Sequence, residues 1–214
     1  MQKSPNVSER NYLTLLMCVC WFAIFFQFYL HINSGVTAKP ELLIRFFSYF
    51  TIDSNLLIAI ASTVLACFPS TKLGAFFAST SVKSALTVYI VVVGLIYNMV
   101  LRFLWVLEGW SMVLNELLHV VVPFMFLIYW IYFVPKHQLV WRNLLPWLIY
   151  PLVYTIFVLV RGSFVNFYPY PFLNIAKLGL NQVLLNCIGV TLLFVFLSTL
   201  FIAIGRRKAK QLKA

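Results

Sequence analysis

The chain has 214 residues, of which 63% are hydrophobic and 10% are charged, and its mean hydropathy is +0.94. Soluble domains carry about 25% charged residues, so this composition excludes an ordinary water-soluble protein. A formal net charge of +11 would suggest a nucleic-acid partner in a soluble protein. Here the basic residues fall mostly in short loops and in the tail, so we interpret the charge as a membrane orientation signal and expect no nucleic acid.

Six long apolar runs follow one another along the chain, each close to the roughly 20 residues that cross a bilayer as a helix. They cover residues 12–32, 43–68, 84–107, 111–134, 144–160 and 176–205. Only helices and closed barrels span hydrocarbon, and barrel strands would show short alternating segments instead. The sequence therefore predicts an all-α, polytopic bundle of six transmembrane helices that forms a single integral membrane domain over residues 1–214.

The Lys and Arg residues indicate how this bundle is oriented. Most of the 16 fall at one set of span ends, including the tail that follows Gly205. Because cytoplasmic loops carry an excess of Lys and Arg, both termini are predicted to be cytoplasmic. The basic tail is expected to contact anionic lipid headgroups, at about 1 kcal/mol per charge.

Polar residues gather in the outer half of the predicted bundle. Thr51 lies about 12 Å into the second span, and His119 lies about 12 Å into the fourth, at 1.5 Å per residue. Ionisable groups inside a membrane are costly and usually face a bundle interior or a wet cavity. The sequence thus predicts a polar cavity open to the outer face; the alternative is a set of contacts that only hold the helices together. The same half also contains Asp53, Asn55, Asn98, Arg102, Asn115 and Glu116.

Helical phase divides the polar residues of the second span. Thr51 and Asn55 are one turn apart and share a face. Asp53 is rotated by about 200° from Thr51, so it is expected to serve a different neighbour. Arg45 and Arg102 are the candidate ion partners for this carboxylate.

The fourth span places Asn115, Glu116 and His119 on one face. A threonine hydroxyl becomes a nucleophile when a base takes its proton, and a neutral histidine within about 3 Å is such a base. Glu116 and His119 also form an E-x-x-H pattern, which occurs twice in di-iron bundles. It occurs once here, in a chain with five acidic residues, so we expect no metal and no cofactor.

Three motifs, RFFSYFTIDSNLL, LNELLHVVVP and FYPYPFLN, resemble the bacterial six-span integral membrane proteins of unassigned function. This resemblance implies a multi-pass protein of the bacterial cytoplasmic membrane. The elements Tyr49-x-Thr51, Asn115 to His119 with Pro123, and YPFL are more distantly similar to the eukaryotic androgen-induced and androgen-dependent membrane proteins. Those proteins hydrolyse fatty acid esters of hydroxy fatty acids with an intramembrane threonine and a histidine. The resemblance places these two roles on Thr51 and His119.

We therefore expect an intramembrane hydrolase of lipid esters in which this threonine is the nucleophile and this histidine the base. Oxyanion or headgroup contacts are expected from Asn55, Asn98 and Arg102, and Glu116 is expected to orient the histidine. The alternative is a membrane transporter, or a protein that binds a lipid or small ligand in the same outer-side cavity. In the first case the partner is a lipid or fatty-acyl substrate that arrives from the bilayer.

Overall fold

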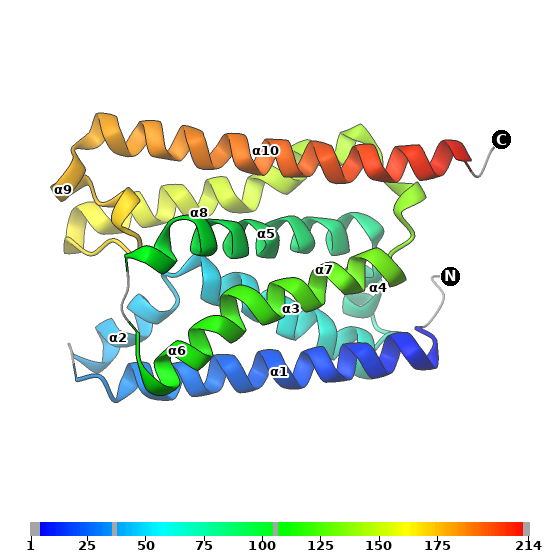
Figure 1. The fold of residues 1–214 in the computed structure, drawn as a ribbon, viewed down its shortest axis with the longest axis horizontal. Helices are drawn as coiled ribbons and strands as arrows, with labels where there is room; N and C mark the ends of the chain where they lie inside the picture. Colours follow the sequence, from blue (N-terminus) through cyan, green and yellow to red (C-terminus); the bar gives the residue numbers. More distant parts are fainter. Residues whose placement is uncertain (1–4, 36–37, 105–106, 212–214) are drawn as a thin grey trace. The chain divides into compact units, whose positions relative to one another are not determined.

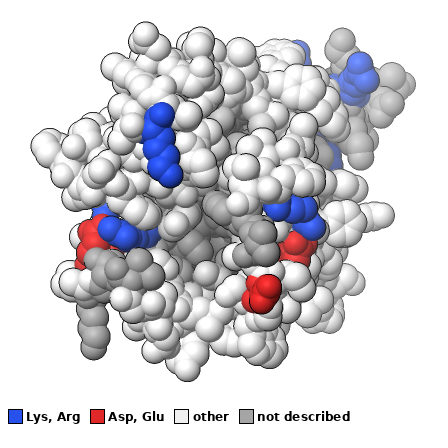
Figure 2. All heavy atoms as spheres, turned by 60° about the vertical axis from the view of Figure 1, so that its left-hand side comes forward, with Lys and Arg blue, Asp and Glu red and all other residues white. Residues whose placement is uncertain are grey.

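The computed structural model describes residues 5–35, 38–104 and 107–211, and every regular element within these ranges is helical. Six helical segments of the described chain are long and apolar enough to cross a membrane, which confirms the predicted fold class. The chain divides into two compact units, Met1–Pro135 and Lys136–Ala214, which we call unit 1 and unit 2. Figure 1 shows the helices of each unit, and the face drawn in Figure 2 carries few charged residues among many uncharged ones.

Unit 1 contains four of the candidate spans. Its longest helix, α1, packs along α3, and α5 packs along α7. Its elements are α1 (Val7–Ile32), α2 (Lys39–Phe46), α3 (Phe50–Cys67), α4 (Lys72–Ala78), α5 (Thr80–Met99), a 3-10 turn (Leu101–Phe103), α6 (Gly109–Glu116), a π-helical turn (Leu117–Val121) and α7 (Val122–Phe133).

The second predicted span is divided into two helices, because α2 ends at Phe46 and α3 begins at Phe50. Ser48 Oγ donates to the carbonyl of Ile44 at 2.6 Å, a local bond that competes with the helical ladder. The amides of Ser48 and Tyr49 bond to carbonyls three residues back instead of four, so the chain tightens here. Thr51 consequently lies in the first turn of a new helix.

The fourth predicted span is also interrupted. Between α6 and α7 the chain forms the π turn, Leu117–Val121, where the Val122 amide bonds to the Leu117 carbonyl. Pro123 follows directly and has no amide hydrogen, so it cannot donate to the carbonyl of His119 four residues earlier. π turns of this kind occur frequently at functional sites, and this one carries His119.

Unit 2 pairs two long helices, α8 (Leu144–Val165) and α10 (Leu180–Gln211), which pack against each other. The short helix α9 (Ile175–Leu178) precedes α10, and Gly179 separates them with φ of +76°. A positive φ favours glycine, so the predicted span 176–205 starts later, at Leu180. α8 ends where Asn166 adopts the left-handed conformation, with φ of 51°.

Candidate functional site

The side chains of Thr51 and His119 are in direct contact inside unit 1. Thr51 Oγ1 lies 3.1 Å from His119 Nε2, and each residue is 6% exposed. Thr51 comes from the first turn of α3, and His119 comes from the π turn. The structure therefore brings together the two residues that the depth count placed at one level of the bundle.

The other ring nitrogen of His119 determines which way this hydrogen bond runs. His119 Nδ1 lies 2.9 Å from the backbone carbonyl of Asn115, and a carbonyl can only accept. Nδ1 therefore carries the proton, Nε2 presents its lone pair, and the Thr51 hydroxyl donates to Nε2. This is the order of nucleophile, base and orienting group found in activated hydroxyl nucleophiles. The group that bonds to His119 Nδ1 is the Asn115 carbonyl. The sequence analysis had expected Glu116 in this place.

Asn55 connects the two segments that carry the pair. Its amide Nδ2 donates to the carbonyl of Thr51 at 2.8 Å and to that of Leu118 at 3.1 Å. The residue is fully buried, and among the described atoms its Oδ1 has no hydrogen-bond partner. Because both amide hydrogens bond to the backbone, Asn55 holds α3 against the π turn and is not placed to stabilise an oxyanion.

Tyr97 lies against the histidine ring. The ring centroids of Tyr97 and His119 are 4.3 Å apart, with an angle of 26° between the planes. The Tyr97 hydroxyl donates to Glu116 at 3.2 Å, and Arg102 Nη2 lies 2.6 Å from the same carboxylate. The sequence analysis did not identify Tyr97; the signal available was its position beside Asn98 in the outer half of the third span.

Asp53 does not form the ion pair expected for it. Arg45 Nε bonds instead to Glu41 Oε1 at 2.8 Å within α2, and Arg102 bonds to Glu116. In the described part of the chain, no basic side chain lies within 4.0 Å of the Asp53 carboxylate. The sequence analysis therefore named the wrong ion partners for Asp53, because Arg45 and Arg102 each pair with a glutamate.

Asn98 also lies apart from the contact between Thr51 and His119. Its side chain is exposed and donates to the Gly94 carbonyl of its own helix at 2.8 Å. This bond is the local type that polar residues form within membrane helices. Of the predicted supporting residues, Asn55 and Asn115 therefore contact the pair directly, and Glu116 and Arg102 approach it through Tyr97.

A second polar cluster, which the sequence analysis missed, lies near the start of α5. Lys83 Nζ is 3.4 Å from Glu9 Oε1, and the Tyr129 hydroxyl donates to the same oxygen at 2.8 Å. Lys83 also lies over the Tyr129 ring, 5.3 Å from its centroid. The predicted span began at residue 84 and left Lys83 in a loop, whereas α5 begins at Thr80 and the lysine is buried. We call Glu9, Lys83 and Tyr129 the charged cluster.

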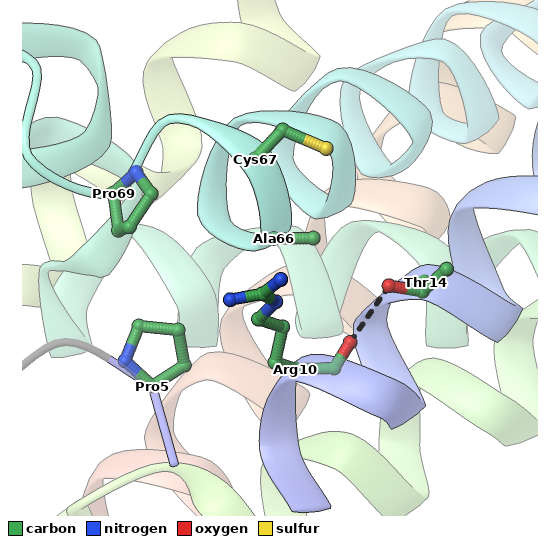
Figure 3. A pocket seen from close by; sticks show the side chains of 6 residues that line it. All are labelled: Pro5, Arg10, Thr14, Ala66, Cys67 and Pro69. Carbon is green, nitrogen blue, oxygen red and sulfur yellow. Dashed lines mark hydrogen bonds between the residues drawn. The ribbon is translucent and has the colours of Figure 1, made fainter. Parts of the chain in front are cut away.

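A surface pocket of about 580 Å³ lies between the start of α1 and the end of α3. Figure 3 shows the Arg10 side chain reaching toward the end of α3, where the helix dipole favours a cation. Thr51 lies at the opposite end of this helix, about 24 Å away at 1.5 Å per residue. The pocket is therefore separate from Thr51 and His119. It is lined by Pro5, Arg10, Thr14, Ala66, Cys67 and Pro69.

Clusters of metal-ligating side chains and the positions of the cysteines were the remaining candidates for chemistry in the described ranges. No group of three or more His, Cys, Asp or Glu side chains is gathered there as a metal site. The cysteines are free thiols, and none of them is part of the contacts around His119.

No family model matches the chain, and neither a curated protein nor a solved structure matches it.

Proposed function

We propose that this chain is an intramembrane hydrolase of lipid esters, with Thr51 as the nucleophile and His119 as the general base. The observation that carries the proposal is the 3.1 Å contact between Thr51 Oγ1 and His119 Nε2. General base catalysis requires hydrogen-bond reach between the base and the hydroxyl, and this distance satisfies it. The resemblance of the surrounding motifs to intramembrane threonine hydrolases points to the same reaction.

The reaction proceeds in two halves. Thr51 Oγ1 attacks the acyl carbonyl carbon while its proton passes to His119 Nε2, and the resulting tetrahedral intermediate collapses. The ester C–O bond breaks, and the leaving alkoxide takes the proton back from His119 as the alcohol departs. Water then attacks the acyl-threonine with His119 again as base, which releases the fatty acid and restores the hydroxyl.

The start of α3 contributes electrostatically to this chemistry. Thr51 is the second residue of α3, and no side chain caps this helix end. The N-terminus of a helix carries a partial positive charge of about half an electron. This charge lies at the carbonyl that Thr51 attacks and stabilises the negative oxygen of the tetrahedral intermediate.

The position of the pair suits a substrate that dissolves in lipid. Both side chains are buried, and both lie within helices long and apolar enough to cross a membrane. An acyl chain partitions into hydrocarbon, whereas a polar ester would have to leave water at high cost. We therefore propose long-chain esters, including fatty acid esters of hydroxy fatty acids, as the substrate class.

The test is hydrolysis by the purified full chain in lipid nanodiscs, with a panel of fatty acid esters of hydroxy fatty acids and simple long-chain esters. Thr51→Ala and His119→Ala are expected to lower the rate of acid release by roughly a thousandfold or more. Thr87→Ala is the matched control, because Thr87 is fully buried in a different helix and its hydroxyl donates to the Lys83 carbonyl of that helix. Acid release that survives in both site variants would contradict the proposal.

A transporter or ligand-binding protein is the alternative that uses the same residues. It predicts no acid release from any ester and a flux or binding signal that persists in Thr51→Ser. The hydroxyl is retained in that variant, so hydrolysis would be reduced but measurable if threonine were the nucleophile. Absence of acid release together with ligand flux would favour the alternative.

A further inference from the structure

Tyr97 stacks on the His119 ring, and the proposed reaction does not use it. It is buried near the end of α5, and its ring is stacked on the imidazole with centroids 4.3 Å apart. The hydrogen bond from His119 Nδ1 to the Asn115 carbonyl fixes one nitrogen but leaves the ring able to pivot about that contact. A ring stacked on its face opposes this movement.

Tyr97 is itself held by two charged residues from neighbouring segments. Its hydroxyl donates to Glu116 Oε1 at 3.2 Å, and Arg102 Nη2 bonds to Glu116 Oε2 at 2.6 Å. The Arg102 guanidinium also lies over the Tyr97 ring, 5.0 Å from its centroid. We call Tyr97, Glu116 and Arg102 the brace. It joins the end of α5, the 3-10 turn and α6 beside His119.

We propose that Tyr97 is a positioning residue that keeps the His119 imidazole turned toward Thr51, and that Glu116 and Arg102 hold Tyr97 in place. This inference rests on the proposed function, since the orientation of the base matters when it takes the threonine proton. It also reassigns two residues. Glu116 acts on the histidine through the tyrosine ring, and Arg102 neutralises Glu116 instead of contacting Asp53.

The first measurement is the rate at which a fluorophosphonate probe modifies Thr51 in the full chain. In this reaction Thr51 Oγ1 bonds to phosphorus, the P–F bond breaks, fluoride leaves, and the threonine proton passes to His119. Tyr97→Leu removes the stacked ring and is expected to slow modification by about tenfold to a hundredfold, the cost of a misplaced catalytic group. Tyr97→Phe keeps the stacked ring and its contact with Arg102 but loses the hydrogen bond to Glu116, so it is expected to slow modification much less than Tyr97→Leu.

Tyr89→Leu is the matched control, because Tyr89 is a second tyrosine of α5 with nearly the same burial as Tyr97. Its ring contacts Phe50 and does not contact His119. The control is expected to lose stability without a comparable loss of modification rate. Equal losses in Tyr97→Leu and Tyr89→Leu would overturn the proposal, because they would indicate a general packing defect.

The second measurement does not depend on catalysis. The chain has three histidines, so nitrogen NMR of a histidine-labelled sample, assigned with His119→Gln, isolates the His119 ring. The wild type is expected to show a protonated Nδ1 and an unprotonated, hydrogen-bonded Nε2. Tyr97→Leu should shift or broaden the Nε2 signal, whereas Tyr97→Phe should preserve it. An unchanged signal in Tyr97→Leu would overturn the positioning role.

A wild type that neither hydrolyses esters nor reacts with the probe would refute the proposed function, while the NMR comparison would still decide whether the brace orients the ring.

Discussion

Within the described part of unit 1, the charged cluster and the pair Thr51 and His119 lie near opposite ends of α5, and they differ in how their polar atoms are satisfied. In the charged cluster, Glu9 Oε1 accepts from Tyr129 and from Lys83. At the other end, Thr51 and His119 are neutral partners, and the buried Asn55 Oδ1 nearby has no partner among the described atoms. Buried polar atoms are nearly always bonded, so the two clusters differ in that the Glu9 oxygen is paired and the Asn55 oxygen is unpaired among the described atoms.

The two clusters also differ in the regularity of the backbone around them. Lys83 and Tyr129 lie in ordinary turns of α5 and α7. Thr51 instead follows the break between α2 and α3, and His119 lies in the π turn. Departures from local rules concentrate at functional sites, where the surrounding structure compensates for them. The comparison supports an architectural role for the charged cluster and agrees with the chemical role proposed for Thr51 and His119.

The largest expected effect is a loss of stability on substitution of Lys83 in the charged cluster. Lys83→Met leaves the Glu9 carboxylate without its cation, and breaking a buried ion pair costs about 3–5 kcal/mol. We expect the lower end of this range, since the two side chains are 9% and 15% exposed. The free energy of unfolding by SDS in mixed micelles measures the loss, and the Thr51 modification rate of the folded fraction should be unchanged. The double variant Glu9→Gln with Lys83→Met should recover most of the lost stability, because no unpaired charge remains. If Lys83→Met were as stable as the wild type, the charged cluster would not have an architectural role.

Asn55→Ala should affect stability and chemistry together. The variant loses the bonds to the Thr51 and Leu118 carbonyls, and at about 1 kcal/mol for each bond the expected loss is about 2 kcal/mol. Thr51 modification should also slow, because α3 and the π turn are no longer tied. Ser62→Ala is the control, since Ser62 is fully buried in the same helix and its hydroxyl has no partner among the described atoms. Ser62→Ala should leave the free energy of unfolding unchanged or raise it. A normal modification rate in Asn55→Ala would show that the tie is not needed.

Tyr129→Phe is expected to destabilise the charged cluster less than Lys83→Met does. It removes the hydroxyl that donates to Glu9 and keeps the ring beneath Lys83. A hydrogen bond to a charged group contributes about 1.5 kcal/mol at the lower end of its range, so a stability loss of this size is expected without change in Thr51 chemistry. Tyr132→Phe, at an exposed position of the same helix, should have no effect on unfolding. A modification rate that falls in Tyr129→Phe would link the two clusters and weaken the contrast between them.

The parts of this arrangement that the sequence predicted depend on hydropathy and depth. The six spans follow from continuous apolar runs, and the meeting of Thr51 with His119 follows from equal distances into two helices. The choice of ion partners could not be predicted, because depth placed Arg102 within reach of both Asp53 and Glu116. Packing, rather than depth, decided in favour of Glu116.

The local irregularities were also beyond the sequence analysis. An apolar run does not show where a helix breaks, so the interruption at residues 47–49 remained hidden within the predicted span 43–68. Lys83 at the edge of an apolar run indicates a loop by composition, yet its stem can be buried when Glu9 lies opposite. Pro123 was the one local signal of the π turn, since a proline inside a helix frees a carbonyl one turn earlier.

The smallest expected change in stability is at Gly94, and it gives the sharpest test of the π turn. A Cβ at this position would lie 3.1 Å from the His119 carbonyl oxygen and 3.4 Å from Pro123 Cβ. Gly94→Ala should therefore push the π turn away from α5 by a few tenths of an ångström. Alanine favours a helix over glycine by about 1 kcal/mol, which offsets much of the packing cost. The free energy of unfolding should consequently change by about 1 kcal/mol or less.

The Thr51 modification rate should respond far more strongly in Gly94→Ala, by about tenfold, because a displaced base cannot reach the hydroxyl as closely. Gly189→Ala is the matched control, since a Cβ there meets nothing within 4 Å in α10 of unit 2. It should gain helix stability and leave the modification rate unchanged. A site that depends on geometry should show a small change in the free energy of unfolding and a large change in the modification rate. Tyr129→Phe in the charged cluster should show the reverse, a loss of stability with an unchanged modification rate. If Gly94→Ala changed both quantities little, the position of the π turn would not limit the chemistry, and the distinction between the two clusters would lose its strongest support.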